Sequence, residues 1–295
     1  MSVAKLVLFA ALGVITVVFV AAWARGVRRN RPASGMRPTP LEMAVGFVTN
    51  FFDTLGIGSF APTTSIFKLK RMVPDERMPG TLNVGHAMPT VVQALVFIAI
   101  VNVGMATLVG LITAAVAGAW LGAGVVASWS RRKVQLGMGG ALLVAAVLFT
   151  MTNLQLIPGG GGALSLGGWR FAAGLAVNFV LGALMTLGIG LYAPCMILVS
   201  LLGMNPIAAF PIMMGSCAFL MPIGSLRFIE KGSYSPRTAL GLSVGGVPGV
   251  LIAAFMVWKL PLTALRWGVV VVVLYTAGAM LRSARRPAGV SPPQG

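Results

Sequence analysis

Charged side chains are scarce in this sequence, and acidic ones are the scarcest. Charged residues make up 9% of the 295, only 5 residues are Asp or Glu, and there is one histidine. A soluble globular domain carries about 25% charged residues, so the composition excludes that class. Hydrophobic residues reach 57% and the mean hydropathy is +0.93. The chain is therefore expected to be an all-α polytopic membrane protein.

Residues that perform catalysis or hold metals and cofactors are also few. A single histidine excludes a His-Glu-x-x-His zinc motif and leaves His86 with Cys217 as a candidate dyad. The two cysteines, Cys195 and Cys217, fall in apolar segments, so a disulfide between them is not expected. Met-rich stretches such as "FPIMMGSCAFLM" indicate packing rather than a metal site. We expect no enzyme activity, no metal and no cofactor.

The excess of basic residues is confined to short loops. The net charge is +17, and most Lys and Arg fall in five clusters, at 25–37, 68–77, 131–133, 227–237 and 282–286. This pattern follows the positive-inside bias of membrane proteins and not that of a nucleic-acid-binding surface. It predicts a cytoplasmic (inner) membrane location, with the N-terminus outside and the C-terminus cytoplasmic. For the N-terminal stretch, a cleaved signal peptide is the alternative to an uncleaved helix.

Seven apolar runs are long enough to cross a bilayer as helices. A span needs about 20 residues to cross about 30 Å of hydrocarbon. The runs cover residues 6–24, 82–101, 104–127, 134–152, 206–226, 238–258 and 264–281. Two further apolar stretches, 41–67 and 171–202, are interrupted by Gly and Pro.

One helix-breaking sequence occurs twice. The stretch "TLGIGSFAPTT" at 54–64 returns 132 residues later as "TLGIGLYAPCM" at 186–196, and more matches follow at offsets of 132 and 131. Such self-similarity indicates two copies of one structural unit. The expected parts are an N-terminal helix with a basic loop (1–40), repeat 1 (41–152), a Gly-rich extracytoplasmic linker (153–169), repeat 2 (170–282) and a cytoplasmic tail (283–295).

The interrupted stretches are too short on each side of the break to cross the membrane. In the first, the arm 42–57 would be about 24 Å long as a helix and the arm 62–69 about 12 Å. A single bent crossing would place the 68–77 cluster outside, so the charges favour a re-entrant hairpin. One such broken hairpin and three transmembrane helices cross the membrane an odd number of times. The fold class expected is therefore an N-terminal helix plus two inverted repeats, as in many transporters.

The break itself offers an anion site. Its glycines permit an unwound backbone, and Pro62 suits the first position of a new helix, with the two threonines in the first turn. A helix N-terminus presents free N–H groups that bind small oxyanions. The alternative is that Gly and Pro serve only helix packing. The expected substrate-binding residues are Gly56, Gly58, Ser59, Pro62, Thr63, Thr64, Asn83, His86, Gly188, Gly190, Pro194, Cys195 and Ser216.

Two titratable residues at membrane depth are candidates for coupling transport to a proton or another cation. Asp53 precedes the first break, where an unpaired carboxylate is costly and usually functional. His86 titrates near neutral pH. The structural alternatives are a partner to nearby backbone for Asp53 and an interhelical hydrogen bond for His86.

These features resemble the TauE/SafE sulfite exporter family of membrane permeases. The resemblance covers about 41–282 and rests on the duplicated "GxxxNF…TLGIG..AP" pattern followed by a helix rich in small residues. It implies a secondary transporter that exports sulfite, organosulfonates or related small anions. The expected partners are that anion and the lipid bilayer, with a homodimer as an open alternative. Cation- or proton-coupled uptake of a sulfur compound and a passive anion channel are the competing functions.

Overall fold

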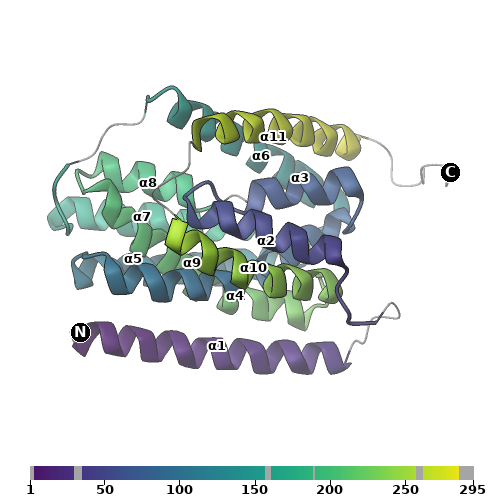
Figure 1. Cartoon of the computed structure of the whole chain (residues 1–295), viewed down its shortest axis with the longest axis horizontal. Helices are drawn as coiled ribbons and strands as arrows, with labels where there is room; N and C mark the ends of the chain where they lie inside the picture. The colour runs from purple at the N-terminus through teal and green to yellow at the C-terminus, as the bar shows by residue number, and fades with distance from the viewer. Residues whose placement is uncertain (1–2, 30–34, 157–160, 189, 257–261, 286–295) are drawn as a thin grey trace.

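The computed structural model describes residues 3–29, 35–156, 161–188, 190–256 and 262–285, and this part of the chain is helical (Figure 1). Within it there is no strand, only an isolated bridge between Ala163 and Met204. Six of the described helices are long and apolar enough to cross a membrane. The chain is therefore a helical, multi-pass membrane protein, as its composition predicts.

The helices occur in the same order in both repeats, after a first helix α1 (Val3–Arg29). Repeat 1 contains α2 (Pro40–Thr54), α3 (Phe60–Lys70), α4 (Met78–Ile100), α5 (Met105–Val126) and α6 (Arg131–Asn153), with a short 3-10 turn, Asp75–Arg77, before α4. Repeat 2 contains α7 (Gly168–Met185), α8 (Tyr192–Leu201), α9 (Ala209–Glu230), α10 (Pro236–Met256) and α11 (Leu262–Arg285), with a matching turn, Pro206–Ala208, before α9. The equivalent helices are α2 and α7, α3 and α8, α4 and α9, α5 and α10, and α6 and α11.

The candidate spans agree with most of the predicted apolar runs. Among the described residues they are α1, α4 with its preceding turn, α5, α7, α9 and α10. The other two predicted runs, 134–152 and 264–281, form α6 and α11, which have 23 and 24 residues. Some side chains of these two helices are not among those that the structure describes. The 18 residues of α7, expected as one arm of a broken stretch, also qualify as a span by length and composition.

The two repeats pack against each other in a reciprocal way. Helix α2 packs on α10 and its counterpart α7 packs on α5, while α4 packs on α9 and α6 on α11 (Figure 1). Glycines allow the close crossings, since a Cβ on Gly249 would collide with the Phe47 carbonyl oxygen and one on Gly118 with that of Phe179. Phe47 and Phe179 are equivalent at the repeat offset of 132, and Gly118 and Gly249 at 131. Equivalent positions therefore make equivalent contacts across the repeats.

Several helix ends that carry basic residues meet at one end of the bundle, which we call the basic end. Glu42 at the start of α2 accepts hydrogen bonds from Arg237 and Thr238 at the start of α10. The Ser235 N–H, just before α10, donates to the hydroxyl of Thr81 near the start of α4. Helices α2, α4 and α10 therefore all begin at the basic end.

Helix α3 ends at the basic end as well. Lys68 in its last turn forms an ion pair of 2.7 Å with Asp75, just before α4. The side chain of Gln135, near the start of α6, donates to the same carboxylate at 2.7 Å. The segment formed by α2 and α3 thus leaves the basic end and returns to it, as the doubling back of these helices shows in Figure 1.

The opposite end of the bundle, which we call the linker end, is tied together by the segment between the repeats. The Gly104 N–H, just before α5, donates to the Leu164 carbonyl oxygen at 2.7 Å. The Asn205 N–H, after α8, donates to the Ala163 carbonyl oxygen at 2.8 Å. Helix α7 begins directly after this segment, at Gly168. The segment formed by α7 and α8 therefore begins and ends at the linker end.

Candidate functional site

The first break separates α2 from α3. Helix α2 ends at Thr54 and α3 begins at Phe60, whereas the sequence predicted arms over 42–57 and 62–69. Gly56 and Gly58 have φ values of 85° and 87°, in the left-handed region that glycine adopts without strain. Pro62 therefore occupies the third helical position. The prediction that it occupies the first position is wrong, because the helix starts two residues earlier.

The backbone N–H groups left unpaired at the starts of α3 and α8 are also not the ones that the sequence predicted. The Thr63 N–H donates to the Ser59 carbonyl oxygen at 3.0 Å, and the Cys195 N–H donates to that of Leu191 at 2.9 Å. Both amides are therefore used inside their helices and are not available to an anion. The N–H groups without a helical partner belong to the residues between each cap and each proline.

Both breaks face one small cavity, which has space for about one water molecule. Each break contributes three residues in a row to its wall. The lining residues are Asp53, Gly58, Ser59, Phe60, Thr90, Met185, Gly190, Leu191, Tyr192, Cys217 and Met221. Two segments 132 residues apart in the sequence therefore meet at one point inside the bundle.

Most of these lining residues form pairs whose two members occupy equivalent positions in the two repeats. The pairs are Asp53 and Met185, Gly58 and Gly190, Ser59 and Leu191, and Phe60 and Tyr192 at an offset of 132, and Thr90 and Met221 at 131. Cys217 lines the cavity without its counterpart at the offset of 131, which is His86. The cavity therefore lies where equivalent parts of the two repeats come together.

The two repeats give the cavity chemically different walls. Repeat 1 contributes one carboxyl and two hydroxyl groups, from Asp53, Ser59 and Thr90. At the equivalent positions repeat 2 has Met185, Leu191 and Met221. A molecule in the cavity would meet these three hydrogen-bonding groups from repeat 1, and sulfur, hydrocarbon and the Tyr192 hydroxyl from repeat 2.

Asp53 is buried, with 3% of its surface exposed, and it is held by groups from both breaks. The Gln93 amide of α4 donates to Asp53 Oδ2 at 2.8 Å, and the Tyr192 hydroxyl of α8 donates to Gln93 Oε1. Ser59 faces the same carboxyl with its hydroxyl and its backbone N–H. A buried carboxyl is costly unless it is hydrogen-bonded, so this chain of contacts offsets much of that cost.

The histidine lies in a separate network, outside the cavity wall. Its Nδ1 atom is 3.0 Å from the Asn50 side-chain oxygen, and its Nε2 atom is 3.1 Å from the Thr63 hydroxyl. These contacts occupy both ring nitrogens of His86 and join α2, α3 and α4. Cys217 instead donates to Met185 Sδ at 3.5 Å. The structure therefore does not bring His86 and Cys217 together as a dyad.

The expected substrate-binding residues divide into two groups. Gly58, Ser59 and Gly190 line the cavity, as does the expected coupling residue Asp53. Asn83 donates to the Pro79 carbonyl oxygen within α4, and Ser216 accepts a hydrogen bond from Asn178 between α9 and α7. The residues that lie away from the cavity wall are Gly56, Pro62, Thr63, Thr64, Asn83, His86, Gly188, Pro194, Cys195 and Ser216.

The other lining residues are ones that the sequence analysis does not select for this site. They are Phe60, Thr90, Met185, Leu191, Tyr192 and Met221, whereas Cys217 is considered there as the partner of His86 in a dyad. The repeat offset is the signal that could find some of them, since Phe60 and Tyr192 lie at the same position within the two duplicated motifs and Met185 is the counterpart of Asp53.

A Gly-x-Ser-x-Gly pattern does occur in the sequence, at residues 241–245, but it forms no nucleophile elbow. Such an elbow joins a strand to a helix. Ser243 lies inside α10, before which the described chain has no strand, and its hydroxyl donates to the Gly85 carbonyl oxygen of α4 at 2.7 Å. The pattern here belongs to the packing of α10 on α4.

Comparisons with known proteins add no assignment to this geometry. No family model, no curated protein and no solved structure matches the chain. The resemblance to the TauE/SafE family therefore rests on the duplicated sequence motifs alone.

Proposed function

We propose that this membrane protein is a secondary transporter that binds its substrate between the two breaks and opens alternately to the two sides of the membrane. The cavity lined by equivalent residues of both repeats is the observation that carries the proposal. Irregular backbone is tolerated at membrane depth where it is buried in protein or lines a cavity. Two related halves around one site can exchange conformations and so expose that site to either side.

The proposed arrangement is a pair of inverted repeats with the basic end in the cytoplasm. Helix α2 starts and α3 ends at the basic end, whereas α7 starts and α8 ends at the linker end. This arrangement supports two hairpins that enter the membrane from opposite sides. The basic loops support the orientation, because Lys and Arg accumulate on the cytoplasmic side. The N-terminus would then lie outside and the C-terminus in the cytoplasm.

The substrate class that we propose is a small sulfur-containing anion such as sulfite or an organosulfonate, moved outward. The class and the direction come from the motif resemblance. Two helix N-termini and the Ser59 hydroxyl could bind oxyanion oxygens. The hydroxyls of Tyr192 and Thr90 could do so once they leave the Gln93 and His86 oxygens to which they now donate. Because Asp53 would repel an anion when ionised, we propose that it is protonated when the anion binds, which makes a proton the coupling ion.

The cavity is smaller than this substrate in the conformation described. It has room for about one water molecule, whereas sulfite contains four heavy atoms. Transport would therefore require a second conformation in which the two breaks move apart. Their contact with each other is thus the part of the fold that we expect to change during the cycle.

Flux assays in proteoliposomes test the proposal. We expect sulfite, sulfoacetate, taurine or thiosulfate to move faster than chloride, and a proton gradient to drive the movement. Thr90→Val should weaken substrate binding about fivefold, as for one lost hydrogen bond of about 1 kcal/mol. Thr113→Val, which changes an exposed threonine of α5, should have no effect.

The same assays separate the alternatives. Flux that follows the anion gradient and ignores the proton gradient would indicate a passive channel. Vesicles oriented as in the cell that accumulate the anion under an inward proton gradient, but release none down an outward anion gradient, would indicate uptake. If no member of the panel moves through folded protein, the proposed substrate class is wrong.

A further inference from the structure

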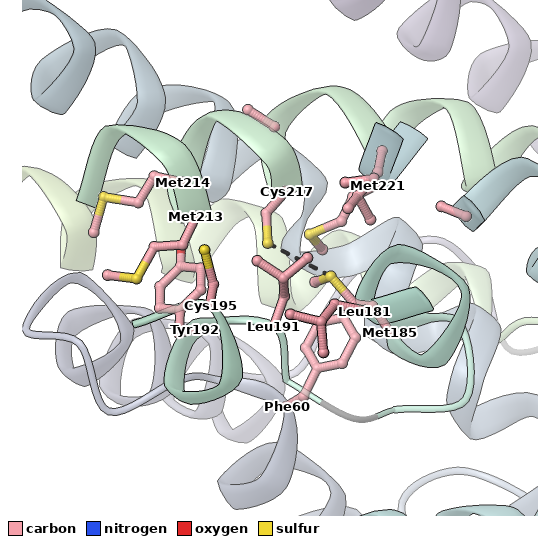
Figure 2. Packing of buried hydrophobic residues seen from close by; sticks show 14 of the residues in the cluster. Phe60, Leu181, Met185, Leu191, Tyr192, Cys195, Met213, Met214, Cys217 and Met221 are labelled. Atoms are coloured by element: carbon pink, nitrogen blue, oxygen red, sulfur yellow. Dashed lines mark hydrogen bonds between the residues drawn. The ribbon is translucent and has the colours of Figure 1, made fainter. Parts of the chain in front are cut away.

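Sulfur atoms gather on one wall of the cavity. Cys217 and Met221 lie one turn apart on α9, and Met185 is the last residue of α7. All three are buried and line the cavity. The Cys217 thiol donates to Met185 Sδ at 3.5 Å and is not in a disulfide. Figure 2 shows these three sulfur atoms close together, with Met213 and Met214 farther along the same helix.

The charge around the cavity favours a cation in this conformation. Asp53 lines the cavity and interacts electrostatically with both Tyr192 and Cys217. The described lining residues include no Lys, Arg or His that could neutralise an anion. The space for about one water molecule also fits a single ion better than a polyatomic one.

The chemistry of the three sulfur atoms matches a soft metal ion. Thiolate and thioether ligands select Cu(I), whereas hard cations prefer oxygen. Two sulfurs at about 2.3 Å from one tetrahedral metal, the distance found for zinc, lie about 3.8 Å apart. The 3.5 Å between Cys217 Sγ and Met185 Sδ is close to that separation. A small outward movement of either side chain would place both sulfurs on one ion.

We propose that Cys217, Met185 and Met221 form a binding site for a soft monovalent cation, Cu(I) or its analogue Ag⁺. The ion replaces the thiol proton of Cys217, so one S–H bond breaks, one metal–sulfur bond forms and no electron is transferred. Asp53, the carboxyl group of the cavity wall, can relay that proton toward the solvent, where the buffer takes it up. This site goes beyond the proposed anion transport and does not depend on it.

Titration of the purified full chain with Ag⁺ tests the site. We expect calorimetry to show one ion bound per chain, and the dependence of the heat on the buffer to show one proton released. Cys217→Ser should weaken the affinity on the order of 100-fold, and Met185→Leu or Met221→Leu on the order of 10-fold. Cu(I), measured without oxygen against a coloured chelator, should give the same ranking.

The chain contains matched controls for both kinds of sulfur ligand. Cys195→Ser removes the other buried thiol and Met214→Leu removes a buried thioether of α9, and neither residue lines the cavity. Both variants should bind Ag⁺ as the unaltered protein does. A loss in these controls equal to that in Cys217→Ser would overturn the site, as would unaltered protein that binds no Ag⁺.

Thermal unfolding of each variant separates lost binding from lost folding. If Cys217→Ser does not fold, the two Met→Leu variants decide, because Leu nearly conserves the volume of Met. Unchanged Ag⁺ affinity in both of them would overturn the proposal. Anion flux is a separate measurement, so failure of the proposed transport function would leave these binding results as they are.

Discussion

Equivalent positions with unlike side chains give the cavity its asymmetry. Asp53 and Met185 hold the same place in the two repeats, as do Ser59 and Leu191. The repeats thus share the order of their helices and the position of their breaks but differ in chemistry at the point where they meet. Asp53 therefore has no acidic counterpart across the cavity, and a proton that it carries would sit on one side of the site only.

Replacement of the Asp53 carboxyl by an amide tests its coupling role. Asp53→Asn keeps the size of the side chain and an oxygen that can accept from Gln93, so we expect folded protein. Flux should lose its dependence on the proton gradient, because the amide cannot bind a proton. Glu230→Gln, which removes an acidic group 69% exposed at the end of α9, should keep that dependence. Proton-driven flux in Asp53→Asn would mean that Asp53 has a structural role only.

The two cavity-lining glycines should respond differently to the same substitution. Gly58 has a φ of 87°, and an added Cβ would meet no atom within 4 Å, so Gly58→Ala carries a backbone penalty alone. We expect it to lower the free energy of unfolding by about 1 kcal/mol. Gly190 also has open space around its Cβ position and lies outside the left-handed region. Gly190→Ala should therefore change the melting temperature less; equal losses in the two proteins would contradict this account.

Helix breaks could be predicted from the sequence, whereas the helix faces that build the cavity could not. The repeated Gly and Pro locate both breaks to within a few residues. Helix α3 still begins at Phe60, because proline is tolerated at any of the first positions, where its missing N–H is not needed. Helices α4 and α9 are buried over most of their length, so hydrophobic periodicity does not show which side carries Thr90 or Met221. That information lies in the packing of α4 on α9, between segments distant in the sequence.

The close crossing of α5 and α7 depends on glycines of both helices, Gly118 and Gly122 on α5 and Gly182 on α7. A Cβ at Gly118 would collide with the Phe179 carbonyl oxygen, and neither backbone can move without disturbing its own helix. Gly118→Ala should therefore lower the free energy of unfolding by about 1–3 kcal/mol, measured by denaturation in detergent. Gly124→Ala, on the same helix with no atom within 4 Å of its Cβ position, is the matched control. A Gly118→Ala protein as stable as this control would show that the crossing is looser than described.

The two ends of the bundle are closed by different kinds of contact. At the basic end the Lys68–Asp75 ion pair, with Gln135, joins α3 to the start of α6. At the linker end the ties include backbone hydrogen bonds such as that between Gly104 and Leu164. Opening the protein toward one side or the other would therefore break different interactions, and the membrane orientation decides which of them faces the cytoplasm.

Single-cysteine labelling of the whole chain tests that orientation and the hairpin together. In a Cys195→Ser, Cys217→Ser background, exposed Glu76→Cys and Ser130→Cys at the basic end should react only from the cytoplasmic side. Asn102→Cys and Ser165→Cys, exposed at the linker end, should react only from outside and serve as the opposite control. Glu76 is the decisive position, because it follows α3 and would lie outside if α2 and α3 together crossed the membrane. Labelling of Glu76→Cys from the same side as Asn102→Cys would therefore exclude the re-entrant hairpin and, with it, the inverted repeats.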